Sequence, residues 1–261
     1  MNMKYISSGL IAFYTKLSYR GNFVIALVTK GMQLALSSFM WIAIYHYGAN
    51  ESIRGFTVAQ MLAYLGVINL LSLVFDFSPI FRLGNLIHNG QLTTYLIRPI
   101  NIFIQGLFQY IGNEAFYIFA FLCISFYFVK SEYSSWASII LIFIFIVCTY
   151  LMFYTCISCI ALTSFWLVQV WPLRPVLTAL FLLLGGQYFP LKVLPLELYN
   201  VVRWSPFSLA GNTLSTILLG HVDGVGILEN ILVSLGWLLF FMIVYKFGWK
   251  CGLNKYMGVG I

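Results

Sequence analysis

Six long apolar stretches occupy most of the chain, and the polar segments between them are too short to hold an enzyme domain. A helix that crosses a bilayer needs about 20 mostly apolar residues, within a range of about 17 to 25. Five stretches reach this length, whereas the fifth is short and broken. The pattern therefore predicts an all-α integral membrane protein with six transmembrane helices. The stretches cover residues 23–47, 56–77, 102–129, 136–168, 176–189 and 227–247.

The segment before the first stretch has a different pattern. Its apolar and aromatic residues recur at helical spacing, which predicts an amphipathic helix over residues 4–20 that lies on the cytoplasmic membrane surface. No small-residue cleavage site follows, so we do not expect a cleavable signal peptide. We therefore divide the chain into an amphipathic interfacial helix (residues 1–22) and one six-span membrane domain (residues 23–261). The residues expected near the lipid headgroups are Lys4, Lys16 and Arg20.

Composition and charge support a membrane location. The chain is 61% hydrophobic and 8% charged, against about 25% charged residues in a typical soluble domain. Its net charge of +7 forms no basic cluster on a polar face, so we expect no nucleic-acid partner. If the N-terminus is cytoplasmic, nine Lys and Arg residues fall on the inner side and four on the outer side. This bias predicts a multi-pass protein of the cell membrane, in contact with lipid, with both termini in the cytoplasm.

The connection between the second and third stretches, residues 78–101, is longer and more structured than a reversal of chain direction between two membrane spans requires. An amphipathic segment is followed by an Asn89–Gly90 turn and a second short segment that closes at Pro99. Two short amphipathic pieces on the cytoplasmic side favour a docking surface for another protein. The alternative is an interfacial helix that rests on lipid.

The fifth stretch breaks near its outer end, at Gly185, Gly186, Gln187 and Pro190. The residues that follow are too polar to span a membrane and too apolar for a free loop. Non-helical backbone at membrane depth is tolerated only where protein or a water-filled cavity surrounds it. We therefore expect residues 187–219 to form a re-entrant outer helical cap between the fifth and sixth spans.

Several kinds of chemistry are absent from the sequence. No phosphate-binding loop of the G-x-x-x-x-G-K-[ST] type occurs, and neither does a zinc-protease H-E-x-x-H motif. The C-x-x-C pair Cys156 and Cys159 lies within an apolar run without a second ligand pair, which favours helix packing over a metal site. We therefore expect no catalytic residue, no metal site and no cofactor in this chain.

Glu114 is the ionisable residue that lies deepest in a predicted span, and Asn113 precedes it. A charged side chain at membrane depth suggests a functional site. The alternative is that Glu114 pairs with a neighbouring helix. Both interpretations remain open on the sequence.

Three segments in order resemble a known family. Residues 87–100, IHNGQLTTYLIRPI, are similar to a cytoplasmic signature with Gly, Leu and then Leu-hydrophobic-Arg-Pro. Residues 185–195, GGQYFPLKVLP, and residues 205–220, SPFSLAGNTLSTILLG, resemble its outer elements. Together with six spans, they resemble the permease of a type-two ATP-binding-cassette (ABC-2) exporter, in the branch associated with drug and antibiotic resistance.

This resemblance implies a partnership. Two permease chains, identical or related, would form the pathway as a dimer, and separate ATPase subunits would bind ATP and Mg²⁺. A coupling helix within residues 80–98 would fit a groove on the ATPase. The implied docking residues are Arg82, Asn85, His88, Gln91, Tyr95 and Arg98. The implied residues of the pathway and outer gate are Asn113, Glu114, Gln187, Phe189, Pro190 and Pro195.

Two other functions compete with the exporter permease. A self-sufficient secondary carrier or channel would use Glu114 as its coupling group, although such carriers usually show repeat symmetry and paired broken helices. A lipid-modifying membrane enzyme would need a cluster of Asp or His at one membrane face. The sequence contains only isolated ones, so the enzyme is the weakest of the three hypotheses.

Overall fold

The computed structural model describes residues 3–48, 52–133, 135–167 and 169–256, and every regular element in these ranges is helical. No strand interrupts the succession of helices in these ranges. The elements are α1 (Met3–Ser18), α2 (Arg20–Gly48), α3 (Val58–Val74), α4 (Ser78–His88), α5 (Leu92–Ile97), α6 (Ile102–Glu132), α7 (Trp136–Ala161), η1 (Leu162–Phe165), α8 (Leu173–Leu184), η2 (Leu191–Val193), α9 (Leu196–Val202), α10 (Pro206–Ser208), η3 (Leu209–Thr213), α11 (Leu214–Leu218) and α12 (Gly224–Lys255).

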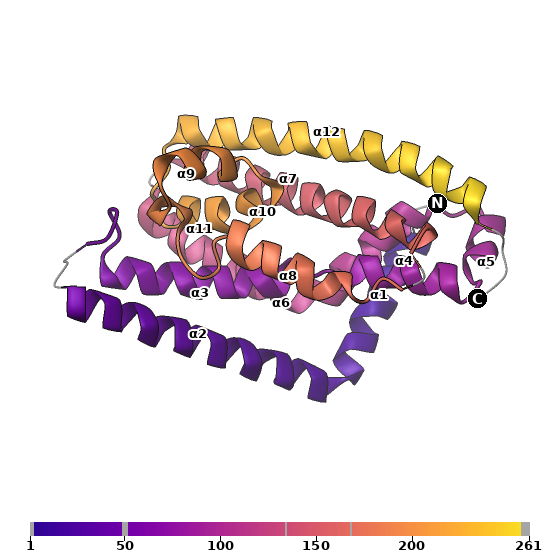
Figure 1. Ribbon diagram of the computed structural model, residues 1–261, viewed down its shortest axis with the longest axis horizontal. Coiled ribbons are helices and arrows are strands. Elements are labelled where there is room, and N and C mark those ends of the chain that lie inside the picture. The colour runs from indigo at the N-terminus through magenta and orange to yellow at the C-terminus, as the bar shows by residue number, and fades with distance from the viewer. Residues whose placement is uncertain (1–2, 49–51, 134, 168, 257–261) are drawn as a thin grey trace.

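Five helical segments are long and apolar enough to cross a membrane, and they run side by side along the long axis of the molecule (Figure 1). They correspond to the first, second, third, fourth and sixth predicted spans. The protein is therefore an all-α, multi-pass membrane protein. In the fourth, α7 and the 3₁₀ turn η1 together end at Phe165, while Val168 lies outside the described residues.

The fifth predicted span differs from a complete transmembrane helix. Helix α8 has only 12 residues, or about 18 Å at about 1.5 Å per residue, against a hydrocarbon core of about 30 Å. It ends at Leu184, and Gly186 adopts a left-handed φ of +78°. The sequence predicted this break correctly. A single continuous helix over residues 176–189 does not form, because the glycine pair ends it.

The centre of the bundle is an aromatic core. Helix α7 packs along α12 and contacts α4 and α6. Phe153 of α7 lies 4.8 Å from Phe75 and 5.8 Å from Phe181 of α8, measured between ring centroids. The exposed fraction of Phe153 is 0%. These rings join the break after α3 to α7 and α8, which holds the short helix in place although it cannot span alone.

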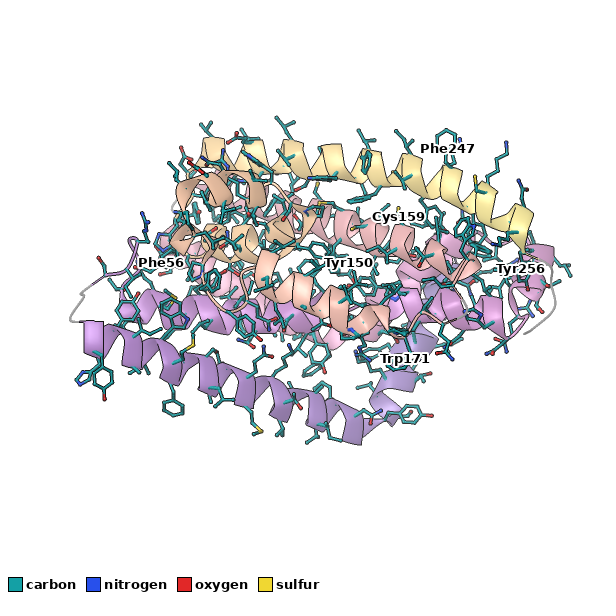
Figure 2. The ribbon with its side chains drawn as sticks, in the orientation of Figure 1. Phe56, Tyr150, Cys159, Trp171, Phe247 and Tyr256 are labelled. Carbon is teal, nitrogen blue, oxygen red and sulfur yellow. The ribbon has the colours of Figure 1, made fainter. Side chains whose placement is uncertain are left out.

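Helix α2 stands apart from this core. It diverges from α3 toward α1 (Figure 1), and its side chains project on all sides (Figure 2). None of the most apolar 18-residue window of α2 is buried. Helix α2 contacts the bundle near both of its ends. Phe23 stacks on Tyr117 of α6 at 5.5 Å between ring centroids. Farther along α2, Trp41 Nε1 donates to the Tyr188 carbonyl oxygen at 2.9 Å and Tyr45 Oη donates to the Phe56 carbonyl oxygen at 2.7 Å. Helix α2 is thus attached near its two ends, with an exposed apolar stretch between them.

The predicted cap separates into two parts. Helix α9 is on the outside, with Leu196 and Val201 73% and 76% exposed. Residues 206–218 form a continuous helical segment, α10–η3–α11, that is almost wholly buried against α3, α6, α7 and α8. Its middle turn is a π-helix. The second half of the cap is therefore part of the bundle interior.

Two ends of the bundle are used as landmarks below. The tip end carries α5 and the last turn of α12, with Tyr256 beside them (Figure 2). The cap end carries α9 and the first turn of α12 (Figure 1).

Candidate functional site

A cavity of about 570 Å³ lies between α2 and the bundle. Side chains of α1, α2, α3, α6 and α8 line it. It combines aromatic rings with ions of both signs, a mixture that is costly inside a membrane unless a pathway or ligand needs it. Its ionisable side chains are Lys16, Lys30, Asp76, Glu114 and Arg174.

A buried ion pair closes one side of this cavity. Lys16 Nζ of α1 donates to Glu114 Oε1 at 2.8 Å and to Oε2 at 2.7 Å. The Glu114 side chain is 3% exposed and that of Lys16 is 35% exposed. The Lys16 Nζ also lies 4.9 Å from the centroid of the Tyr117 ring. Of the two interpretations that the sequence left open, the structure supports the pairing of Glu114 with a neighbouring helix.

The contact between α1 and α6 is unusually close. Gly9 lies directly against Gly112, because a Cβ added at Gly112 would collide with the Gly9 carbonyl oxygen. Tyr5 stacks on Phe108 at 6.0 Å, and its hydroxyl accepts a hydrogen bond from the Asn101 backbone N–H at 3.1 Å. The sequence predicted a surface helix with Lys16 at the headgroups. The structure adds a partner that this prediction lacked, since small residues let α1 approach α6 closely enough for the Lys16–Glu114 ion pair.

The sequence analysis predicted no role for Asp76 and Lys30, and both line the cavity. Asp76 follows α3, where the helix breaks: its backbone N–H donates to Tyr110 Oη at 3.1 Å and its Oδ2 accepts from the Ser78 N–H at 3.0 Å. Lys30 Nζ donates to Gln33 Oε1 at 3.1 Å. Only their charge at membrane depth marked these residues in the sequence.

The predicted pathway residues separate into two groups. Asn113, Glu114 and Gln187 line the same cavity. Gln187 is 2% exposed and its Nε2 has no partner among the described residues. It also borders a second cavity of about 490 Å³ between α2, α3 and the turn after α8. The two cavities share Thr29 and Gln187, so they follow α2 as one interrupted groove.

The remaining gate candidates, Phe189, Pro190 and Pro195, lie outside the groove, on the chain that leads into the cap. The segment that leads into the cap is held in place by Asn212, a residue that the sequence did not mark as important. Asn212 of the π-turn accepts a hydrogen bond from the Leu191 N–H at 2.9 Å, and its Oδ1 lies 3.2 Å from Tyr64 Oη. Tyr64 Oη also donates to the Gly186 carbonyl oxygen at 2.7 Å.

The tip carries most of the predicted docking residues. Asn85, Gln91 and Arg98 are exposed, while His88 and Tyr95 are half-buried. Exposed apolar side chains accompany them, with Ile97 80% and Leu96 43% exposed. We call residues 85–98 the tip surface.

Arg82 is placed differently. It lies on α4, whose Ile80 and Leu83 are buried. A Cβ added at Gly106 would lie 2.8 Å from Arg82 Nη1 and 2.6 Å from Tyr154 Oη, so the guanidinium is turned toward α6 and α7. Helix α4 therefore continues the bundle, and α5 is the piece that presents a surface.

The tip surface is attached to the last helix. Tyr256 Oη donates to the Gly90 carbonyl oxygen at 3.2 Å and lies 3.1 Å from Thr93 Oγ1. Since α12 runs without interruption from Gly224 to Lys255, it connects the tip with the cap end.

The remaining candidate chemistry is structural. Within the described ranges no three His, Cys, Asp or Glu side chains converge on a possible metal position. Cys159 Sγ lies 3.1 Å from the Phe241 carbonyl oxygen and Cys156 is buried, as expected of residues in the α7–α12 contact.

Comparison with known proteins identifies the family. A search of curated proteins and a search of solved structures each gave no match. A family profile described as ABC-2 family transporter protein matches residues 32–260. This match covers most of the chain, including α3 to α12 and the tip surface, and it agrees with the family that residues 87–100 and 185–220 resemble. The chain therefore belongs to the ABC-2 transporter family.

Proposed function

We propose that this chain is the permease subunit of an ABC exporter. Two such chains line a translocation pathway as a dimer, and separate ATPase subunits bind the two tip surfaces and drive transport. The observation that carries the proposal is a groove of mixed polarity along α2, in a chain of the ABC-2 family. Outward transport follows from the family resemblance.

The groove is half of the pathway in this proposal. Helix α2 is attached through Trp41 and Tyr45 near the cap end and through Phe23 at its start, and it diverges from α3 toward α1. Its exposed apolar side chains therefore face either lipid or the second permease chain. A substrate with an apolar body and a polar group fits the aromatic and charged lining.

The tip surface suits an ATPase groove. It combines a cation, amides and large apolar side chains, the mixture typical of protein interfaces. Tyr256 and the buried side of α4 hold it rigidly, so movement of an ATPase would be passed to α4 and α12. The proposed orientation puts the tip and both termini in the cytoplasm and the cap outside.

Co-purification tests the proposal. The chain is expressed with the ATPase genes next to its own, extracted in mild detergent, and pulled down through a tag while ATPase activity is followed. Arg98→Glu reverses the charge of an exposed tip residue and should release the ATPase. Lys130→Glu, which changes an exposed residue at the cap end, is the matched control and should retain it.

A chain that purifies without an ATPase, yet transports substrate into vesicles, would overturn the proposal in favour of a self-sufficient carrier. The Lys16–Glu114 pair argues against the carrier, because Glu114 already has a cation as its partner within the chain. Glu114→Gln should leave ATP-driven transport measurable, whereas a carrier coupled through Glu114 would lose its dependence on pH or sodium.

A further inference from the structure

A separate cavity of about 400 Å³ lies at the cap end, between α9, the turn after α11 and the first turns of α12. It shares no lining residue with the groove along α2. Its charged side chains are Lys192, Arg203, Asp223 and Glu229, and the imidazole of His221 lies among them. We call it the cap pocket.

The charges of the cap pocket do not neutralise one another. In the described part of the chain the one ion pair within 4.0 Å is Lys16–Glu114, so neither cation of the pocket meets either of its carboxylates at that distance. Asp223 Oδ1 accepts from the Gly226 N–H at 3.1 Å as the cap of α12. Arg203 Nε and His221 Nε2 are buried without a partner. A buried N–H that makes no hydrogen bond is costly, which favours a ligand at this position.

The walls of the pocket are held in place. The Arg203 guanidinium stacks on Trp204 at 4.1 Å, and Trp237 Nε1 donates to the Trp204 carbonyl oxygen at 2.8 Å. On the other side, Tyr133 Oη lies 2.8 Å from the carbonyl oxygens of both Ile217 and Val222. The separation between cations and carboxylates is therefore built into the fold.

Large apolar side chains flank the pocket on both sides. On α9, Leu196 is 73% and Val201 is 76% exposed, and on α12 Val225 is 75% exposed. Apolar surface of this kind gains about 25 cal/mol per Å² when it leaves water. In a membrane protein it lies against acyl chains, so the polar pocket opens beside lipid. This position favours a lipid headgroup over a soluble ligand.

We propose that the cap pocket binds the headgroup of a phospholipid that carries a phosphate and a primary ammonium group. Arg203 and Lys192 would hold the phosphate, and Glu229, with Asp223, would hold the ammonium. A quaternary ammonium needs a cage of aromatic faces, but the Trp204 face is occupied by Arg203. An anionic headgroup without an amine would provide no cation for the carboxylates of Asp223 and Glu229. This inference does not depend on the proposed transport function.

Lipid retention tests the assignment. The full-length chain is purified in mild detergent and exposed to equal amounts of phosphatidylethanolamine, phosphatidylcholine and phosphatidylglycerol, and bound lipid is counted by native mass spectrometry. We expect phosphatidylethanolamine to be retained preferentially. Arg203→Gln and Glu229→Gln each remove one charge-assisted contact and should lower its retention about tenfold. Lys130→Gln and Glu197→Gln change exposed charges outside the pocket and should not.

Three results would overturn the proposal. The first is equal retention of the three lipids by the unaltered chain, a comparison that needs no variant to fold. The second is unchanged retention by Glu229→Gln in a preparation that melts like the unaltered chain. The third is binding of soluble glycerophosphoethanolamine as tight as that of the lipid, because the acyl chains would then contribute nothing and the ligand would be a soluble one.

Discussion

Lys16 and Glu114 are separated by 98 residues in the chain, yet Lys16 Nζ lies within 2.8 Å of both carboxylate oxygens of Glu114. The pair joins the first helix to the middle of α6 and forms part of the cavity wall. Removing one partner of a buried ion pair leaves an unpaired charge, which costs about 3–5 kcal/mol.

We expect Lys16→Met to lower the free energy of unfolding by an amount near that range, reduced because Lys16 is partly exposed. The double variant Lys16→Met with Glu114→Gln should recover most of the loss, because no charge is then left without a partner. Denaturation in detergent measures both, and Lys4→Met, an exposed change on the same helix, is the control. Equal losses in the single and double variants would show that the two residues are not coupled.

The close approach of α1 and α6 gives a second prediction. Gly112→Ala places a methyl group onto the Gly9 carbonyl and should push the helices apart, at a cost of about 1–3 kcal/mol for overpacking. Gly236→Ala on α12 meets no atom within 4 Å and should be neutral or slightly stabilising. Melting temperatures of the two variants distinguish these outcomes. Similar shifts for both glycines would contradict the close helix contact.

The Asn212 junction gives a third prediction. Asn212→Leu leaves the Leu191 N–H without an acceptor inside the protein, a loss of about 1–3 kcal/mol. Amide hydrogen exchange should accelerate in the peptide around residues 186–193, which Asn212 and Tyr64 hold together. Asn200→Leu, an exposed change on α9, should leave that peptide unaffected. Unchanged exchange in Asn212→Leu would show that the turn is held by other contacts.

His221 gives a prediction about pH. Burial and the nearby Lys192 lower the pKa of this imidazole, with Glu132 opposing them. An unfolded histidine titrates near pH 6.5. Below that pH the unfolded chain takes up a proton that folded His221 resists, so stability should fall as pH decreases from about 6.5 to the folded pKa. Melting curves between about pH 7.5 and 5 should show this decline, and His221→Gln should reduce it. His46→Gln, at an exposed position, should retain it.

Much of the fold follows from hydrophobic pattern alone. Long apolar runs have one stable solution in lipid, the helix, because all backbone hydrogen bonds are then internal. The break after Leu184 could be predicted for the same kind of reason, since Gly185 and Gly186 occur together. For residues 206–218 the sequence predicted an outer cap and not a buried segment. Their mixed polarity does not reveal which helices surround them.

The site was less predictable. Lys16 was assigned to the membrane surface, since nothing in the local pattern indicates a partner in another helix. Asp76 and Lys30 gave only a weak signal, and their common cavity depends on how α2 diverges. Arg82 carries the charge expected of a docking residue, but Gly106 and Tyr154 on neighbouring helices determine where its side chain points.

The short length of α8 has a consequence for biosynthesis. Helix α2 is long and apolar, and none of its most apolar 18-residue window is buried, so it can enter the bilayer alone as soon as it is made. Helix α8, with 12 residues, cannot. It needs Phe75 and Phe153, made earlier, and Phe207, made later, whose rings surround Phe181. Its final insertion therefore waits until translation has passed the cap. The order of synthesis and the order of insertion differ at this helix.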